Sequence, residues 1–176
     1  MTVIAAYIDT EGRTAIGCDT GISTDGYCAT VPTKLVRVGL AIVGWCGAPL
    51  WGRYLRGAEG VTSPADLERL ADGWHRWGKE RGHGQTQEGM ALQWGSMVAA
   101  LPGSLWTLAS DGSVLPTTTG YVAVGSGGPV AMGALAVARR LEMAAARAVK
   151  AALDAAVLHA DGVFGRLDVQ VLEQSG

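Results

Sequence analysis

Three side chains near the start of the chain could together cleave an amide bond. They are Thr2, which follows Met1, and the more distant Asp19 and Lys34. A free α-amino group has a pKa of roughly 7.7–8.0, so after removal of Met1 the Thr2 amine could take the proton of its own hydroxyl, directly or through a water. A lysine ammonium beside that hydroxyl favours the alkoxide, and an aspartate holds the lysine charged and oriented. Such a threonine nucleophile needs no histidine.

Met1 decides whether this chemistry can operate. If Met1 is retained, the Thr2 amine is acylated and cannot act as a base. Threonine is small enough to permit removal of a preceding methionine, so we expect Thr2 to become the first residue.

Other interpretations of these residues stay open at this point. Asp19 could be a turn residue or a helix cap, and Lys34 a solvated strand end. Cys18 and Cys46 flank the proposed site, but neither has a histidine at a recognisable spacing, so we interpret both as buried packing residues. The three histidines form no metal-ligand spacing, and we expect no metal and no cofactor.

The glycine-rich segment 125–128 has a second interpretation as a phosphate cradle. Glycines before a helix expose backbone N–H groups to anions. No Lys-Ser or Lys-Thr pair follows the segment, which excludes a P-loop.

Strand and turn signals alternate with helical ones along the chain. We expect a hairpin over residues 2–8 and 14–19, a second over 35–38 and 40–43, and a short helix over 49–56, which makes four strands before any long helix. Ser63 should cap a helix that has Pro64 at its first position and ends near Arg81. The later elements are a polar loop over 82–89, strands near 96–101, 105–109 and 121–125, two helices within 129–160, and a last strand over 166–173.

The order of elements favours antiparallel sheets with segregated helices over a repeating βαβ design. A four-layer αββα sandwich, an α+β fold with two antiparallel sheets, satisfies this order. With 48% hydrophobic residues and no linker, the chain should form one domain over residues 1–176.

Composition excludes several classes of partner. The formal net charge of −2, with no basic run, predicts no binding to nucleic acid or to an anionic membrane. Charged residues interrupt the apolar region 131–160, so we expect no membrane span. Three cysteines and the absence of a basic and then apolar leader favour the cytoplasm over secretion.

The ordered set of motifs resembles the proteasome β-subunit family of N-terminal-nucleophile (Ntn) hydrolases, most closely the bacterial HslV type. The motifs are the opening hairpin from Thr2 to Asp19, Lys34, the corner Gly44-Trp45-Cys46-Gly47, and the segment from Tyr121 to Pro129. The resemblance implies a threonine peptidase that cuts unfolded polypeptide. It also implies stacked six- or seven-membered rings that enclose a chamber and, usually, an ATP-dependent unfoldase docked on the ring.

The same resemblance assigns roles to further residues. The backbone N–H at Gly47 would stabilise the oxyanion, where a side chain could obstruct close approach, and Ser126 would relay protons near the Thr2 amine. Thr20, Gly21 and Trp45 would contact the substrate.

The chain departs from the family pattern at three places. Phe164, in Asp161-Gly162-Val163-Phe164, stands where the family has a supporting serine. Cys18-Asp19-Thr20-Gly21 is closer to proteasome usage than to the Gly-Asp-Gly-Gln of HslV-type chains, which leaves the ring size open. The segment 74–94 matches neither subgroup.

Two other functions therefore accompany the peptidase hypothesis. A structural relative without catalysis could serve as a ring or assembly scaffold. An Ntn amidase could instead act on a small-molecule amide, since this fold hosts several amide hydrolases.

Overall fold

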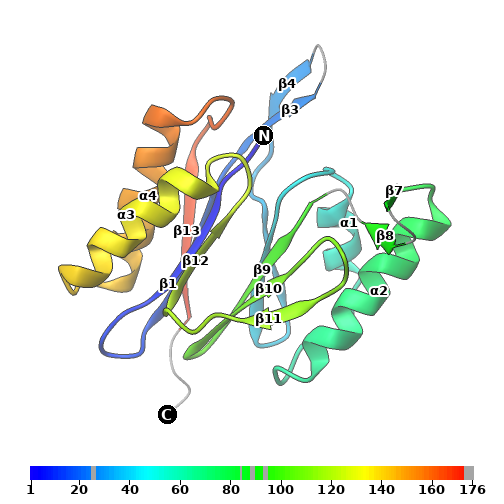
Figure 1. Cartoon of the computed structure of the whole chain (residues 1–176), viewed down its shortest axis with the longest axis horizontal. Coiled ribbons are helices and arrows are strands. Elements are labelled where there is room, and N and C mark those ends of the chain that lie inside the picture. The colour runs from blue at the N-terminus through cyan, green and yellow to red at the C-terminus, as the bar shows by residue number, and fades with distance from the viewer. Residues whose placement is uncertain (25–26, 84, 88–89, 93–94, 173–176) are drawn as a thin grey trace.

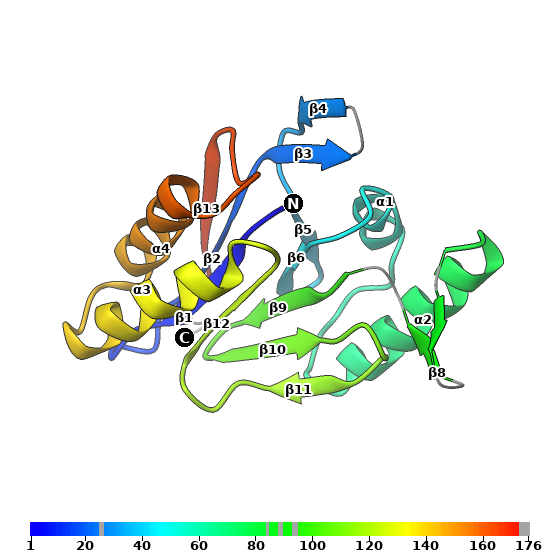
Figure 2. The same ribbon diagram turned by 45° about the horizontal axis from the view of Figure 1, so that its top comes forward.

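The computed structural model describes residues 1–24, 27–83, 85–87, 90–92 and 95–172. Two antiparallel sheets pack face to face, and a pair of helices covers the outer face of each (Figure 1). The predicted four-layer αββα sandwich is therefore confirmed. The N-terminus lies at one end of the sandwich, beside the hairpin of β3 and β4 (Figures 1 and 2).

The first sheet has the strand order β12-β1-β2-β13 and carries α3 and α4 on its outer face. Its central pair, β1 and β2, forms the predicted opening hairpin. The bounds of these elements are β1 Ile4–Ile8, β2 Thr14–Asp19, β12 Tyr121–Val124, β13 Leu167–Leu172, α3 Gly128–Arg140 and α4 Ala145–His159.

The second sheet has the order β11-β10-β9-β6-β5 and carries α1 and α2. Two small hairpins, β3 with β4 and β7 with β8, lie outside both sheets. The bounds are β3 Gly21–Thr24, β4 Tyr27–Thr30, β5 Leu35–Val38, β6 Ala41–Trp45, α1 Trp51–Arg56, α2 Asp66–Glu80, β7 Gln85–Gln87, β8 Met90–Leu92, β9 Met97–Leu101, β10 Ser104–Leu108 and β11 Val114–Pro116.

Side-chain alternation along the strands fills three apolar layers. Ile4 and Ala6 of β1 point between the two sheets, whereas Ala5 and Tyr7 point toward α3 and α4. The third layer lies under α1 and α2 and contains the largest fully buried aromatic side chains of the described chain, Trp51 and Trp74. Both faces of β1 and β2 are thus buried, which fixes the strand ends where Thr2 and Asp19 lie.

Several predicted elements need correction. Six strands, not four, precede α1, because β3 and β4 form a hairpin; β4 is largely exposed and shows no clear alternation of apolar residues. β11 was not predicted, and the loop predicted over 82–89 contains β7. Residues 84, 88 and 89 of that loop, 93 and 94 of the unmatched segment 74–94, and the predicted strand end at 173 lie outside the described residues.

The helix starts also differ in detail from prediction. α2 begins at Asp66, and Ser63 does not cap it; instead the Asp66 carboxylate accepts hydrogen bonds from the backbone N–H groups of Thr62 and Ser63, at 2.8 and 3.0 Å. The Ala-rich region does form two helices. They separate after Arg140, where Glu142 adopts a positive φ of 50° without a glycine or proline to mark the turn.

Among the described residues, no helix has both the length and the apolar character needed to cross a membrane.

Gly17 of β2 sets the distance between the first sheet and α4. A Cβ at this position would lie 2.8 Å from both Leu153 Cδ1 and Val149 Cγ1. Gly17→Val should therefore lower the free energy of unfolding by about 1–3 kcal/mol through overpacking, measured by urea denaturation. Gly133→Ala in α3 is the control, since a Cβ there meets nothing within 4 Å and should be neutral or stabilising by up to about 1 kcal/mol. Equal stability of the two variants would contradict this packing.

Candidate active site

The Thr2 hydroxyl lies in a buried polar cluster just before β1. Lys34 Nζ donates hydrogen bonds to Thr2 Oγ1 at 2.5 Å and to Asp19 Oδ1 at 2.9 Å. The Lys34 and Asp19 side chains are both fully buried, and Thr2 is only 5% exposed. The fold therefore brings together the three residues that could cleave an amide bond.

Asp19 is positioned by backbone N–H groups just before β1 and at the start of β3. It ends β2, and its carboxylate accepts hydrogen bonds from the N–H of Val3 at 2.8 Å and the N–H of Gly21 at 3.2 Å. Together with the ion pair to Lys34, these bonds satisfy both carboxylate oxygens inside the protein. Asp19 thus holds the lysine and the chain segment after Thr2 in one arrangement.

The charge of Lys34 is opposed by burial and supported by Asp19. Burial lowers the pKa of Lys34 from its ordinary value of 10.5, and the Asp19 carboxylate raises it again through its charge and its hydrogen bond. A protonated Lys34 can donate to Thr2 Oγ1 and stabilise negative charge on that oxygen.

The segment around Ser126 wraps the Thr2 backbone. Thr2 N–H donates to Ser126 Oγ at 3.0 Å, and the Thr2 carbonyl accepts bonds from Ser126 Oγ at 3.3 Å and from Gly127 N–H at 3.2 Å. Gly125 has a φ of +92°, and a Cβ there would overlap the Thr2 carbonyl. The Gly127 and Gly128 N–H groups are used within the protein, which argues against a phosphate cradle.

A small cavity of about 20 Å³ lies beside Thr2. Gly47, at a φ of +94°, and Trp45 both line it. The complete lining is Met1, Thr2, Ile22, Ser23, Trp45, Gly47 and Pro49.

Thr20 and Gly21 do not line this cavity. Thr20 Oγ1 accepts a hydrogen bond from Arg166 N–H at 2.9 Å, and Gly21 N–H donates to the Phe164 carbonyl at 2.8 Å. Phe164 also packs so closely that a Cβ at Gly21 would lie 2.8 Å from its ring. The structure therefore joins these two residues to the loop before β13.

The two cysteines beside the site are buried thiols. Burial raises the pKa of Cys18 to about 11, and burial also raises the pKa of Cys46, whose Sγ donates to the Ser96 carbonyl at 3.3 Å. A thiolate, not a thiol, is the nucleophilic form of cysteine. Neither residue is suited to compete with Thr2.

Sequence reasoning missed a contact that positions Lys34. Thr33 Oγ1 donates to Asp168 Oδ2 of β13 at 2.5 Å and accepts from Leu35 N–H at 3.0 Å, so it fixes the backbone on both sides of Lys34. The available signal was an aspartate at one of the two polar positions of the alternating last strand.

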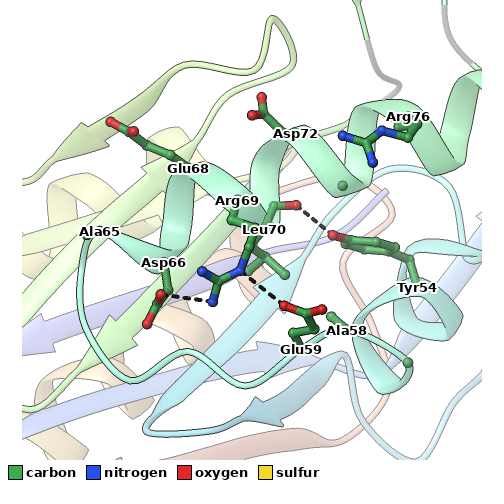
Figure 3. Close-up of a pocket in the computed structure, with 12 residues that line it drawn as sticks. Tyr54, Ala58, Glu59, Ala65, Asp66, Glu68, Arg69, Leu70, Asp72 and Arg76 are labelled. Atoms are coloured by element: carbon green, nitrogen blue, oxygen red, sulfur yellow. Dashed lines mark hydrogen bonds and ion pairs between the residues drawn. The ribbon is translucent and has the colours of Figure 1, made fainter.

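A larger cavity, of about 570 Å³, lies between α1 and α2 and shares no lining residue with the small one (Figure 3). Arg69 pairs there with Glu59 at 3.2 Å and Asp66 at 2.8 Å. Tyr54 Oη donates to the Leu70 carbonyl at 2.6 Å, and burial raises the pKa of Tyr54 to about 12. These groups stabilise the helix pair and offer no activated nucleophile. Within the described part of the chain, no three His, Cys, Asp or Glu side chains are placed to hold a metal ion.

The structure is similar to solved proteasome-like proteins over its whole length. BPH from Thiobacillus denitrificans matches with a TM-score of 0.84 and 22% identity, covering 98% of each chain. The same protein in complex with epoxomicin matches with a TM-score of 0.82 and 21% identity, covering 99% of this chain and 100% of that one. Eukaryotic HslV from Trypanosoma brucei matches with a TM-score of 0.71 and 18% identity, covering 98% of this chain and 99% of that one.

No protein-family model and no curated protein matches the sequence. The structural likeness therefore defines the class by fold: the chain has the Ntn-hydrolase sandwich of HslV-like and proteasome-like proteins. The resemblance that the sequence motifs indicated is confirmed at this level.

Removal of Asp19 tests the buried ion pair. Asp19→Ala leaves the Lys34 charge buried without its partner, which should lower the free energy of unfolding at pH 7 by about 3–5 kcal/mol. Without Asp19 the pKa of Lys34 falls further, so between this lowered pKa and about 10.5 the folded variant binds fewer protons than the unfolded chain. Its stability should therefore rise from pH 7 to pH 9 in urea denaturation.

Asp154→Ala provides the matched control. It removes the exposed pair with Lys150, at 2.8 Å, and should cost less than about 1 kcal/mol with little dependence on pH. If Asp19→Ala behaves like this surface variant, the buried pair does not stabilise the site as described.

Proposed function

We propose that this chain is a threonine peptidase subunit in which Thr2 is the N-terminal nucleophile after removal of Met1. The observation that carries the proposal is the fully buried Lys34 ammonium, which bonds both Asp19 and the Thr2 hydroxyl. The similarity to proteasome-like structures, one of them in complex with epoxomicin, supports the same chemistry.

Acylation would start at the free Thr2 amine. The amine takes the Oγ1 proton, directly or through a water, while Lys34 stabilises the oxygen that attacks the peptide carbonyl. The Thr2 Oγ1–carbon bond forms and the peptide C–N bond breaks. The leaving amine takes the proton, which leaves an ester on Thr2. A carbonyl fits beside this hydroxyl, since the Met1 carbonyl accepts a hydrogen bond from Thr2 Oγ1.

Deacylation would reuse the same groups. The Thr2 amine takes a proton from water, the hydroxide attacks the ester, and Thr2 Oγ1 recovers its proton as the product acid leaves. Ser126, whose Oγ lies 3.0 Å from the Thr2 nitrogen, would relay protons, and Gly47 N–H would stabilise the oxyanion in both steps. Asp19 and Lys34 remain in place throughout.

The proposal extends to the assembly and its partners. The substrate would be unfolded polypeptide, and the subunits would form a homo-oligomeric ring of six or seven members, stacked in two rings around a chamber, with an ATP-dependent unfoldase as partner. The location would be the cytoplasm. The HslV-like and BPH-like neighbours support the ring-forming part of this proposal.

Substitution of Thr2 tests the nucleophile. In protein freed of Met1, Thr2→Ala should abolish peptide hydrolysis and labelling by a threonine-directed covalent probe, because it removes the only attacking oxygen. Thr2→Ser, which keeps an hydroxyl, should retain both. Intact mass reports removal of Met1 and addition of the probe. Light scattering should show a particle of six or more subunits.

Each other outcome identifies a different function. Undiminished labelling of Thr2→Ala would contradict the proposal. Absence of labelling in Met1-free parent protein would favour a catalytically inactive scaffold, and an active monomer or dimer would favour an amidase for small-molecule amides.

The pH dependence of kcat/KM should be bell-shaped. Activity should rise as the Thr2 amine loses its proton, and fall as Lys34 loses its own. Because burial lowers the pKa of Lys34, the alkaline limb should lie below pH 10.5. Asp19→Asn removes the charge that opposes this shift, so it should move the alkaline limb to lower pH. An alkaline limb that does not move in Asp19→Asn would contradict the assigned role of Lys34.

A further inference from the structure

The backbone of Lys34 contacts a strand of each sheet. Its carbonyl accepts a hydrogen bond from the N–H of Trp45 in β6 at 3.2 Å, and its own N–H donates to Cys18 Sγ in β2 at 3.4 Å. A lysine carries its charge on a flexible four-carbon stem, so the position of the ammonium depends on how firmly the backbone is held. Sulfur is a weak acceptor, so the bond from Lys34 N–H depends on how the Cys18 thiol is itself held.

The residue before Lys34 has a hydroxyl with a single hydrogen to donate. Thr33 gives this hydrogen to the Asp168 carboxylate, with Thr33 Oγ1 and Asp168 Oδ2 2.5 Å apart. A hydrogen bond to a carboxylate is stronger than one between neutral groups. Thr33 Oγ1 also accepts a hydrogen bond from Leu35 N–H at 3.0 Å, which leaves the oxygen able to accept one more.

Cys18 supplies that additional hydrogen. Its Sγ lies 3.9 Å from Thr33 Oγ1, and because Thr33 gives its own hydrogen to Asp168, the thiol is the donor in this contact. Burial raises the pKa of Cys18 to about 11, so the thiol keeps its hydrogen at neutral pH. The hydrogen bonds therefore run in one direction, from the Lys34 N–H through the thiol and the Thr33 hydroxyl to the carboxylate.

Strand pairing places the carboxylate at the end of this chain of hydrogen bonds. β13 pairs with β2 so that Asp168 lies opposite Cys18, and directly opposite side chains project from the same face of a sheet. β13 is an edge strand of the first sheet, and Thr33 leads into β5, an edge strand of the second. Gln170 Nε2 also donates to Asp168 Oδ2, at 3.1 Å, and helps to orient the carboxylate. The chain of bonds thus joins the two sheets beside Lys34.

We propose that Asp168 and Thr33 are positioning residues that hold Lys34 in place for catalysis. This inference rests on the proposed function. The attacking oxygen of Thr2 is stabilised only by an ammonium at the correct distance, and a displacement of about 1 Å can cost about a hundredfold in rate. Neither positioning residue lines the cavity beside Thr2, so their loss should lower kcat and leave KM unchanged.

The first test measures peptide hydrolysis by Met1-free variants of Thr33. Thr33→Val keeps the branched shape of the side chain but removes the hydroxyl, so kcat should fall by about tenfold or more with KM unchanged. Thr33→Ser keeps the hydroxyl and should retain the parent kcat. A Thr33→Ser variant as slow as Thr33→Val would overturn the proposal.

A double-mutant cycle tests the role of Asp168. Asp168→Ala removes the acceptor of the same hydrogen bond, so it should lower kcat to a similar extent. The double variant with Thr33→Val should be no slower than the slower single variant, because both substitutions break one interaction. Losses of rate that multiply would show that the two residues act independently, which contradicts the chain of bonds.

Val169→Ala, on the same strand, is the matched control for a loss of stability. Val169 packs against the helix layer of α3 and α4, on the opposite face of β13 from Asp168, so this variant should unfold at a lower urea concentration. Its kcat should equal that of the parent, because the contacts of Thr33 remain. If Val169→Ala loses as much kcat as Asp168→Ala, the effect of Asp168 is one of stability alone and the proposal is wrong.

The outcomes separate this inference from the proposed function. If Met1-free parent protein hydrolyses peptides and Thr33→Val retains the parent kcat, the positioning role is wrong and the peptidase proposal stands. Failure of the parent to hydrolyse any peptide would overturn both. Should Asp168→Ala not fold, Thr33→Val and Thr33→Ser still decide the question.

Discussion

A lysine side chain without solvent contact must find its hydrogen-bond partners inside the protein, and the placement of Lys34 organises the rest of this site. Its ammonium bridges Asp19, at the end of β2, and Thr2, just before β1. Desolvation of two charges is costly unless their geometry and remaining hydrogen bonds are satisfied. The backbone donors at Val3 and Gly21 meet this requirement for the carboxylate, so strand pairing and the ion pair depend on each other.

Close backbone approach is the second constraint. The Thr2 backbone is held by Ser126 and Gly127, and only a residue without Cβ can stand at Gly125. Gly17 also lacks a Cβ where one would obstruct packing, because a Cβ there would meet the Leu153 and Val149 side chains of α4. Helix packing, sheet register and the position of the Thr2 nitrogen are therefore coupled, and a change in one is transmitted to the others.

The sequence predicted most of the sandwich because apolar alternation and turn residues mark its buried strands. It failed at the β3 and β4 hairpin, where an exposed β4 carries no such pattern. It predicted two Ala-rich helices but did not locate the turn between them near Glu142. Thr2, Asp19, Lys34 and Ser126 were found from residue type and order, and the structure brings them together. The contact of Thr33 with Asp168 joins distant strands, and the attachment of Thr20 and Gly21 to the loop at Phe164 depends on tertiary packing. Local sequence does not report either arrangement.

The central claim is that the Thr2 amine must be free for catalysis. The most direct measurement compares peptide hydrolysis by two preparations that differ only in Met1, with their intact masses verified and their particle sizes matched. The account predicts turnover by the form that begins at Thr2 and none by the form that keeps Met1, in which the same nitrogen is an amide. Equal turnover by both forms would contradict it.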